Sequence, residues 1–429
     1  MANERKLLVK ALLKAEKEGY SNIILNNILR DSNLNNAEKG FITRLFYGVI
    51  ERKITLDFVL NKFLKKPVKK CPPYTASVLR SGAYQILFME KVPNSAAVNE
   101  SVKLVKKSKE SGNSGLVNAV LRKISEADFK EIFCNAPCDV KYSVNKWIAD
   151  MLEASYGNEI TKKFLENSLE PPPIFIRINT IKGNVFEAVC AEFKELGINL
   201  KETSIKGVYK TDSIRNIEDT RAYKNGLIFV QDISSVICSK AVAAKPGMRV
   251  LDCCAAPGGK SFSIGIDMDN RGEIISCDLH GSRVNLIESG KNRLAISCIK
   301  PLINNAEIFN KDLGEFDRVL CDVPCSGIGV IRRKPEIKYK ENDECAKLPD
   351  IQLKILSASS KYVKPGGRLI YSTCTLLKRE NEDIVEKFLK DNDEFVPDSL
   401  SEDYEKTNIT FIPPKSEGDG FFVAAFKRK

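Results

Sequence analysis

Three consecutive prolines, Pro171-Pro172-Pro173, divide this chain of 429 residues into two parts with different hydrophobic patterns. Proline lacks an amide donor and restricts the residue before it, so no helix continues through this segment. Before the prolines, apolar residues recur with the helical period; after them, short apolar runs alternate with helical stretches. At roughly 150 residues per domain, the length suggests two or three domains. We therefore predict a helical part, a boundary at the prolines, and α/β structure beyond it.

The first 125 residues predict packed helices. Ile42, Leu45, Phe46, Val49 and Ile50 lie at helical spacing, and two further stripes repeat the pattern. We assign these side chains to the core and give them no chemistry. Residues 126–170 predict connecting helices.

Lysines cluster between the apolar stripes, and the whole chain is basic. Lys and Arg number 67 against 56 Asp and Glu, a formal net charge of +11. The two clusters are Lys62, Lys65, Lys66, Lys69 and Lys70, and Lys103, Lys106, Lys107 and Lys109. A basic balance favours a polyanionic partner, and lysines along a nucleic acid replace its counterions. The clusters either face phosphates or form an ordinary solvated surface.

Cysteine and histidine usage excludes several classes of protein. The chain has 13 Cys, no C-x-x-C pair and a single histidine, His280. We therefore expect reduced thiols in a cytoplasmic protein and no metal site. One histidine excludes the usual Ser/His hydrolases and the His-based metal hydrolases. The N-terminus lacks a signal-peptide core, no run approaches about 18 apolar residues, and we expect no membrane span.

Beyond the prolines, the pattern predicts a small α/β unit followed by a larger one. The small unit has predicted strands at 174–179, near 198–200 and at 227–230, with a helix at 185–196. From about residue 236, strands at 249–253, 273–277, 299–303, 318–322 and 368–373 alternate with helices, and 421–426 is a last strand. This alternation predicts a doubly wound parallel sheet, and the apolar runs predict strands covered on both faces.

The strand at 249–253 runs into a glycine-rich turn, Cys254-Ala255-Ala256-Pro257-Gly258-Gly259-Lys260. Ligands of open α/β sheets bind beyond the carboxyl ends of strands, and glycines allow close approach to the backbone. A Walker A loop needs a glycine at Cys254, and the G-x-G-x-x-G dinucleotide fingerprint is absent. We expect a nucleoside-type ligand, with Asp278 at the end of the next strand accepting ribose hydroxyl hydrogen bonds.

Two further strand ends carry cysteines. Asp322-Val323-Pro324-Cys325-Ser326-Gly327 follows one strand, and Ser372-Thr373-Cys374 follows the next. A buried cysteine is usually inert packing, which we expect for the other eleven. At neighbouring strand ends, however, Cys325 and Cys374 would converge beside the nucleoside site.

These segments together resemble the bacterial small-subunit (16S) ribosomal RNA cytosine-5 methyltransferases of the Fmu/Sun, or RsmB, type. The resemblance covers essentially the whole chain and includes Arg177-Ile178-Asn179-Thr180 and Gln231-Asp232-Ile233-Ser234-Ser235. It implies an all-α NusB-like domain (1–140), connector helices with a small α+β, RRM-like domain (141–235), and a Rossmann-like α/β methyltransferase domain (236–429). The implied cofactor is S-adenosylmethionine, and the implied partner is 16S ribosomal RNA.

The resemblance also implies a role for each site residue. Cys374 would be the nucleophile that adds to carbon 6 of cytosine, and Cys325 would help its release after carbon 5 is methylated. Asp322 would hydrogen-bond the cytosine edge and border the cofactor. By the same resemblance, the residues that would bind the cofactor are Cys254, Ala255, Ala256, Pro257, Gly258, Gly259, Lys260 and Asp278. Asn305 would contact the adenine end, where the family usually has an acid.

Recognition of the RNA is open in more than one respect. The target base must leave its stack or be unpaired. Arg332-Arg333-Lys334, just after the Cys325 loop, either touches RNA or is solvated surface. Transfer RNA is an alternative substrate, and an inactive NusB-like RNA- or transcription-factor-binding protein is an alternative function. Nothing indicates an obligate oligomer, so we expect a monomer.

Overall fold

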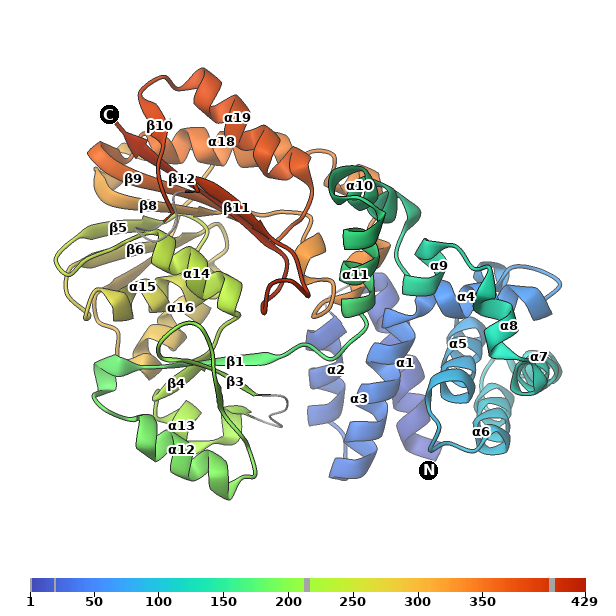
Figure 1. The fold of residues 1–429 in the computed structure, drawn as a ribbon. Coiled ribbons are helices and arrows are strands. Elements are labelled where there is room, and N and C mark those ends of the chain that lie inside the picture. The colour runs from blue at the N-terminus through green and yellow to red at the C-terminus, as the bar shows by residue number, and fades with distance from the viewer. Residues whose placement is uncertain (1, 19–20, 212–216, 401–405) are drawn as a thin grey trace. The chain divides into compact units, whose positions relative to one another are not determined.

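The computed structural model describes residues 2–18, 21–211, 217–400 and 406–429, and Figure 1 shows its ribbon. The chain forms two compact units. The helical unit comprises Met1–Leu169 and Arg333–Glu341, and the α/β unit comprises Glu170–Arg332 and Asn342–Lys429.

Helices make up the first unit. In chain order they are α1 (Ala2–Glu18), α2 (Ser21–Arg30), α3 (Asn36–Glu51), α4 (Lys53–Phe63), α5 (Pro73–Phe88), α6 (Asn94–Lys106), α7 (Ser114–Glu126), α8 (Phe129–Cys134), α9 (Cys138–Tyr142), α10 (Lys146–Tyr156) and α11 (Asn158–Asn167), with short 3-10 helices η1 (Val68–Lys70), η2 (Ser111–Asn113) and η7 (Pro335–Tyr339).

Helix α3 illustrates how the sequence pattern becomes structure. Asn35 caps it: its side chain accepts the Glu38 amide hydrogen at 3.0 Å, and the Glu38 carboxylate accepts the Asn35 amide hydrogen at 2.9 Å. The predicted stripe from Ile42 to Val49 is buried, which confirms its assignment to the core.

Residues 333–341 pack into the helical unit although they follow β8 of the α/β unit in the chain. The Tyr339 hydroxyl donates to the Ile50 carbonyl at 2.6 Å and lies 2.9 Å from Ser143 Oγ. The neighbouring Lys338 is fully buried, and burial lowers its pKa to about 7. The chain therefore passes between the two units at three points.

The α/β unit begins with a small antiparallel sheet in the order β2-β3-β1-β4. Its elements are β1 (Ile174–Ile178), η3 (Thr180–Lys182), α12 (Phe186–Glu195), β2 (Lys201–Glu202), β3 (Val208–Thr211), η4 (Ile217–Asp219), α13 (Arg221–Lys224) and β4 (Ile228–Val230). Arg177 pairs with Asp267 at 2.6 Å, and Asn179 donates to the Leu294 carbonyl at 2.8 Å. These buried contacts attach the small sheet to the larger domain of the same unit.

The larger sheet is mixed, in the order β10-β12-β9-β8-β5-β6-β7, with β11 beside β12. Strands β5 to β9 are parallel, and β10 to β12 are antiparallel. Its elements are α14 (Ile233–Ala241), β5 (Arg249–Asp252), α15 (Gly259–Asp267), β6 (Glu273–Asp278), α16 (Gly281–Leu294), β7 (Ile299–Ile303), η5 (Lys311–Leu313), β8 (Phe316–Asp322), η6 (Ile328–Val330), α17 (Asn342–Cys345), α18 (Leu348–Ser360), β9 (Val363–Thr373), η8 (Lys378–Glu380), α19 (Glu382–Asp391), β10 (Phe395–Pro397), β11 (Asn408–Phe411) and β12 (Phe421–Arg428).

Helices cover both faces of this sheet (Figure 1). Alternate strand residues face opposite sides, so Val250 packs in the core with α14, α15 and α16, whereas Leu251 packs in the core with α18 and α19. The predicted strands at 249–253, 273–277, 318–322, 368–373 and 421–426 are confirmed within one or two residues at most bounds.

Two expectations about strands are wrong, and three strands were not predicted. Residues 198–200 are not a strand, because the short strand there is β2, at the edge of the small sheet. Strands β3, β10 and β11 were not predicted. Strand β7 is not covered on both faces: it ends the sheet order, and Leu302 and Ile303 are exposed.

The domain boundaries stay a prediction. The expected boundary at 140/141 falls inside α9, and the connector helices α10 and α11 belong to the helical unit.

Candidate functional site

The sheet order reverses direction along the chain at β5 and β8. From β5 the chain builds outward through β6 and β7, whereas β8 and β9 lie on the other side of β5. Ligands of open α/β sheets bind at such a switch point, outside the carboxyl ends of the strands. The glycine-rich turn follows β5, and the Cys325 turn follows β8, so both lie at this edge.

The structure brings Cys325 and Cys374 together. Their Sγ atoms are 3.2 Å apart, and both residues are half-buried. Gly329 holds the second turn in place, because its amide donates to the Cys374 carbonyl at 2.9 Å and its own carbonyl accepts from Gly420 at 2.9 Å. A Cβ atom on Gly329 would lie 2.0 Å from the Gly420 oxygen, so only glycine permits this approach. Two thiols this close can divide the chemistry: one can act as the nucleophile and the other as the proton acceptor.

Asp322 is paired on both carboxylate oxygens. Lys260 Nζ lies 2.6 Å from Oδ2, and Ser372 Oγ donates to Oδ1 at 2.8 Å. Lys260 also lies 5.1 Å from the centre of the Phe421 ring. Burial lowers the pKa of Lys260, but the charge of Asp322, its hydrogen bond to Lys260 and the charges of Cys238 and Asp252 together raise this pKa above its usual value. Cofactor binding by Lys260 stays a prediction; in the structure its ammonium group neutralises the strand-end acid Asp322.

The glycine-rich turn has the geometry of a ligand-accepting loop. Gly258 has a φ of +109°, and a Cβ there would lie 2.4 Å from the Phe262 ring. The Ala255 amide donates to the Cys277 carbonyl at 2.7 Å, which ties the turn to β6. Helix α15 begins at Gly259, so its first amides point toward the turn and favour a ligand with polar or anionic groups.

Asp278 lies beside this turn. Its carboxylate is 4% exposed and lies 3.3 Å from Arg283, which also donates to the Ala256 carbonyl at 2.7 Å. The His280 amide donates to Asp278 at 3.2 Å. A carboxylate has about four acceptor positions, so Asp278 can still accept from hydroxyl groups. The exposed apolar side chain of Leu279 comes next in the chain.

Asn305 lies in the loop after β7. Its side-chain oxygen accepts the Glu307 amide hydrogen at 3.0 Å, so the side chain shapes its own turn. The adjacent Asn304 is closer to Asp278, because its amide donates to the Asp278 carbonyl at 3.1 Å. The assignment of Asn305 to the adenine end stays a prediction.

Sequence reasoning missed three buried polar residues near the site. Asp252 ends β5 and accepts from Ser261 Oγ at 2.7 Å; burial raises its pKa to about 7. Glu380 and Asn381, in and just after η8, are fully buried and bond to the two cysteine turns. One signal in the sequence indicates Glu380 and Asn381: they are adjacent polar residues that follow Cys374 by only a few positions.

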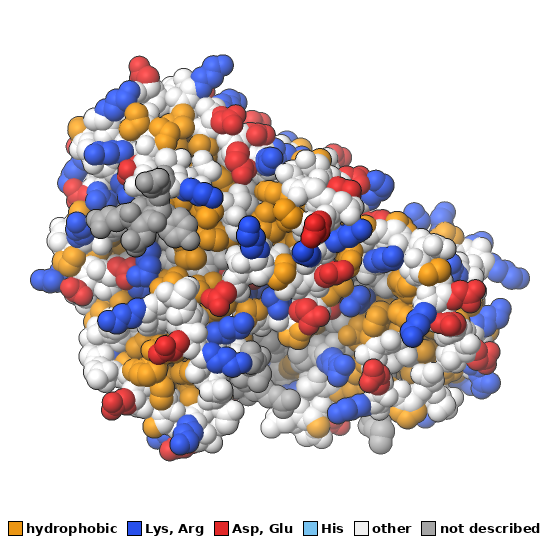
Figure 2. Space-filling view, viewed as in Figure 1, with side chains coloured by type: hydrophobic (Ala, Val, Ile, Leu, Met, Phe, Trp, Pro, Cys, Tyr) orange, Lys and Arg blue, Asp and Glu red, His pale blue; other side chains and the backbone are white. Residues whose placement is uncertain are grey.

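The basic segments have different environments. Lys62, Lys65, Lys66, Lys69 and Lys70 are all exposed on the helical unit. Arg332 donates to the Glu170 carbonyl at 2.9 Å and contacts the Pro171 carbonyl, so it holds the proline segment. Arg333 belongs to the other unit. Figure 2 shows lysine and arginine side chains over both units on the face in view, with acidic ones between them.

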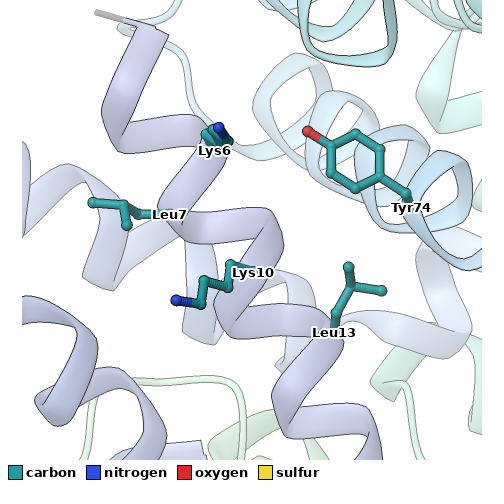
Figure 3. A pocket seen from close by; sticks show the side chains of 5 residues that line it. All are labelled: Lys6, Leu7, Lys10, Leu13 and Tyr74. Atoms are coloured by element: carbon teal, nitrogen blue, oxygen red, sulfur yellow. The ribbon is translucent and has the colours of Figure 1, made fainter. Parts of the chain in front are cut away.

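The helical unit also has a hollow of about 470 Å³, lined by Lys6, Leu7, Lys10, Leu13 and Tyr74. Lys6 and Lys10 come from α1, and the Tyr74 hydroxyl points toward that helix from α5 (Figure 3). The lining thus combines lysine side chains with an aromatic one, residue types that can bind phosphates and base faces.

Within the described ranges, no three side chains of His, Cys, Asp or Glu are grouped as metal ligands. In the same part of the chain, every helix is too short or too polar to cross a bilayer.

Family models match three successive parts of the chain. Residues 2–126 match the NusB family, residues 144–208 match the ferredoxin-like domain of the RsmF/B-like methyltransferases, and residues 239–427 match the 16S rRNA methyltransferase RsmB/F. These matches confirm the predicted resemblance and the fold class of each part.

Similar proteins span the whole chain. The probable ribosomal RNA small subunit methyltransferase B of Bacillus subtilis (strain 168) is 34% identical over 450 residues, 99% of this chain and 98% of that protein. The corresponding protein of Synechocystis sp. (strain ATCC 27184 / PCC 6803 / Kazusa) is 31% identical and covers 96% of each chain. The crystal structure of PH0851 has a TM-score of 0.86 at 24% identity and covers 100% of this chain and 99% of that one. That likeness shows the fold.

Proposed function

Because this chain belongs to the RsmB/F family of small-subunit ribosomal RNA methyltransferases, we propose that it methylates carbon 5 of a cytosine in 16S ribosomal RNA. The 3.2 Å approach of Cys325 and Cys374 at the switch point carries this proposal. A single base placed over the pair can be attacked by one sulfur while the other stays within reach of the same ring.

S-adenosylmethionine fits the residues beside the pair, and when bound it supplies an electrophilic methyl group. The turn Cys254–Lys260 would hold its polar part, and Asp278 would accept its ribose hydroxyl hydrogens. Support comes from the start of α15 at Gly259, whose first amides point toward the turn, and from the 4% exposed Asp278 side chain, which Arg283 ties to the turn. Leu279 offers an apolar surface for the adenine.

The proposed steps use the chain's own side chains in order. The Cys374 thiolate forms a bond to carbon 6, which makes carbon 5 electron-rich enough to accept the methyl group. Asp322, oriented by Lys260 and Ser372, accepts a hydrogen bond from the amino edge of the base and so holds the ring in position for attack. A Cys325 thiolate then takes the proton from carbon 5. The bond between Cys374 and carbon 6 breaks, which returns the thiolate.

RNA binding is proposed for the basic and aromatic surfaces of the helical unit. Its NusB-family match and the exposed lysines at 62–70 support this placement. A base in a duplex must be flipped out before it reaches the cysteines, so an unpaired target is favoured. The cytoplasmic location and the monomeric state belong to the same proposal.

The direct test is a labelling assay. The protein is incubated with methyl-labelled S-adenosylmethionine and deproteinised 16S ribosomal RNA from cells lacking the enzyme, with transfer RNA as a second substrate. We expect labelled 5-methylcytidine at one site in the ribosomal RNA. Label only in transfer RNA rejects the substrate, and no label in either RNA leaves the binding-protein alternative.

A trapping experiment tests the roles of the two thiols. Cys325→Ala should accumulate a covalent protein–RNA complex on a denaturing gel, because Cys374 can attack but is not released. Cys374→Ala should form none, and Cys134→Ala, an exposed cysteine in the helical unit, should behave like the unchanged protein. The reverse pattern would show that the roles are exchanged.

A further inference from the structure

Glu380 holds the turn that carries Cys325. Its Oε2 atom accepts the Ser326 amide hydrogen at 2.9 Å and a hydrogen of Gln352 Nε2 at 2.9 Å. The same Gln352 nitrogen donates to the Pro324 carbonyl at 3.0 Å, so both neighbours of Cys325 are tied to one buried group. Glu380 is fully buried, and among the residues described its Oε1 atom has no hydrogen-bond partner.

Asn381 holds the turn that carries Cys374. Its side-chain oxygen accepts from Thr373 Oγ1 at 2.6 Å, and its side-chain nitrogen donates to the Thr375 carbonyl at 3.1 Å. The two turns are also joined directly, because Ser326 Oγ and Thr375 Oγ1 lie 2.7 Å apart. Adjacent residues thus fix the two sulfurs at their short separation.

The charges around Cys325 favour its neutral form. The titratable groups that face it are Cys374, Glu380, Asp322 and Tyr371. The hydrogen bond with Cys374 and burial raise the pKa of the Cys325 thiol, and the charges of the Cys374 thiolate, Glu380 and Asp322 raise it further. Asp322 has the Lys260 ammonium as its partner, whereas Glu380 Oε2 accepts from two neutral amides, those of Ser326 and Gln352.

We propose that Glu380 is a positioning residue that keeps the shared proton on Cys325 until Cys374 has bonded to the base. This inference rests on the proposed function. The Glu380 charge disfavours a thiolate at Cys325, so the negative charge of the pair forms on Cys374. When Cys374 bonds to carbon 6, its charge passes into the ring and its hydrogen bond to Cys325 is lost. Cys325 then gives its proton to water, and its thiolate, strengthened as a base by Glu380, accepts the carbon 5 proton.

The test replaces Glu380 with glutamine. The amide oxygen can occupy the position of Oε2, so Ser326 and Gln352 keep their acceptor while the charge is removed. In a Cys374→Ser background, the rate of Cys325 alkylation by iodoacetamide is followed against pH by mass spectrometry of its peptide. A nearby like charge raises the pKa of a thiol by about one unit or more. We expect the Cys325 midpoint to move down by about one pH unit in Glu380→Gln.

The matched control is Glu386→Gln, which removes an exposed carboxylate from the following helix and should leave the midpoint unchanged. An unchanged or higher midpoint in a folded Glu380→Gln protein would overturn the proposal. When Cys374 is present, the Glu380→Gln protein should accumulate more covalent protein–RNA complex than the unchanged protein does.

A second variant keeps the proposal testable if Glu380→Gln does not fold. Gln352→Met removes one neutral donor from the carboxylate and so leaves its charge less screened. The Cys325 midpoint should rise, and a fall or no change would count against Glu380. The alkylation readout needs neither RNA nor cofactor. A shifted midpoint without any RNA methylation would therefore reject the proposed function and retain the coupling between Glu380 and Cys325.

Discussion

Replacing Lys260 with methionine removes the cation that neutralises Asp322 while keeping a side chain of similar length. The ammonium nitrogen lies 2.6 Å from Asp322 Oδ2, and after its removal Ser372 Oγ, 2.8 Å from Oδ1, still donates to the carboxylate. Deleting one partner of a buried pair destabilises a protein by about 3–5 kcal/mol. The Asp322 side chain is 27% exposed, so water recovers part of this loss. We expect the lower end, about 3 kcal/mol.

Native-state hydrogen exchange of the β8 and β9 amides measures this loss locally, because exchange reports the free energy of opening each segment. A loss of about 3 kcal/mol corresponds to exchange roughly 150-fold faster. Lys364→Met is the matched control: its pair with Asp317, at 2.8 Å, involves side chains 40% and 30% exposed. Such a pair contributes about 1 kcal/mol at most.

The double variant Lys260→Met/Asp322→Asn completes the test. It should recover much of the lost stability, because no unpaired carboxylate remains. The reasoning is refuted if the amides of Lys260→Met exchange as slowly as those of Lys364→Met. It is also refuted if the stability loss of the double variant equals the sum of the losses of its two single variants.

Three further predictions concern pH, packing and salt. Burial raises the pKa of Asp252 from 3.8 to about 7, above its unfolded value, so ionisation opposes folding. The free energy of unfolding should fall as pH rises from about 4 to 7, by about 4 kcal/mol at most, and Asp252→Asn should remove this part of the urea-midpoint dependence. Gly329→Ala places a methyl group 2.8 Å from the Cys374 oxygen and should slow labelled methyl transfer by about a hundredfold, whereas Gly115→Ala, with open space around it, should not. Fluorescence anisotropy gives the slope of log affinity for single-stranded ribosomal RNA against log salt, which is negative. In Lys65→Glu/Lys66→Glu this slope should become less steep by about 1.4, because two phosphate contacts are lost. An unchanged slope would place the RNA elsewhere.

Much of the fold was predictable because its signals are local. The apolar spacing around Ile42 predicts a buried helix face from residues within a few turns of one another. The turn after β5 is predicted from its own glycines, which give the backbone the freedom to turn. The errors arose where position in the sheet matters. Strand β7 has an apolar sequence like its neighbours, but it lies at the edge, so Leu302 and Ile303 are exposed. Strand β2 is too short, at two residues, to leave a period-2 pattern.

The approach of the two strand-end cysteines was predictable from the sequence, but most of the contacts around them were not. Cysteines at successive strand ends indicated Cys325 and Cys374, because neighbouring parallel strands end at the same edge. Glu380 has no periodic or turn signal of its own. Its contact with the Cys325 turn is made to the Ser326 amide, which lies 54 positions earlier in the chain.

The amino-acid sequence by itself determined the helical and α/β parts, the proline boundary and the residues placed at strand ends, since these follow from periodicity and backbone restriction over a few neighbours. Tertiary structure alone decided that sulfurs 49 positions apart lie 3.2 Å from each other, that Lys260 pairs with an acid 62 positions away, and that residues 333–341 return to the helical unit. Those contacts depend on the order in which strands enter the sheet, and that order is set by the packing of all of the elements together rather than by any one segment.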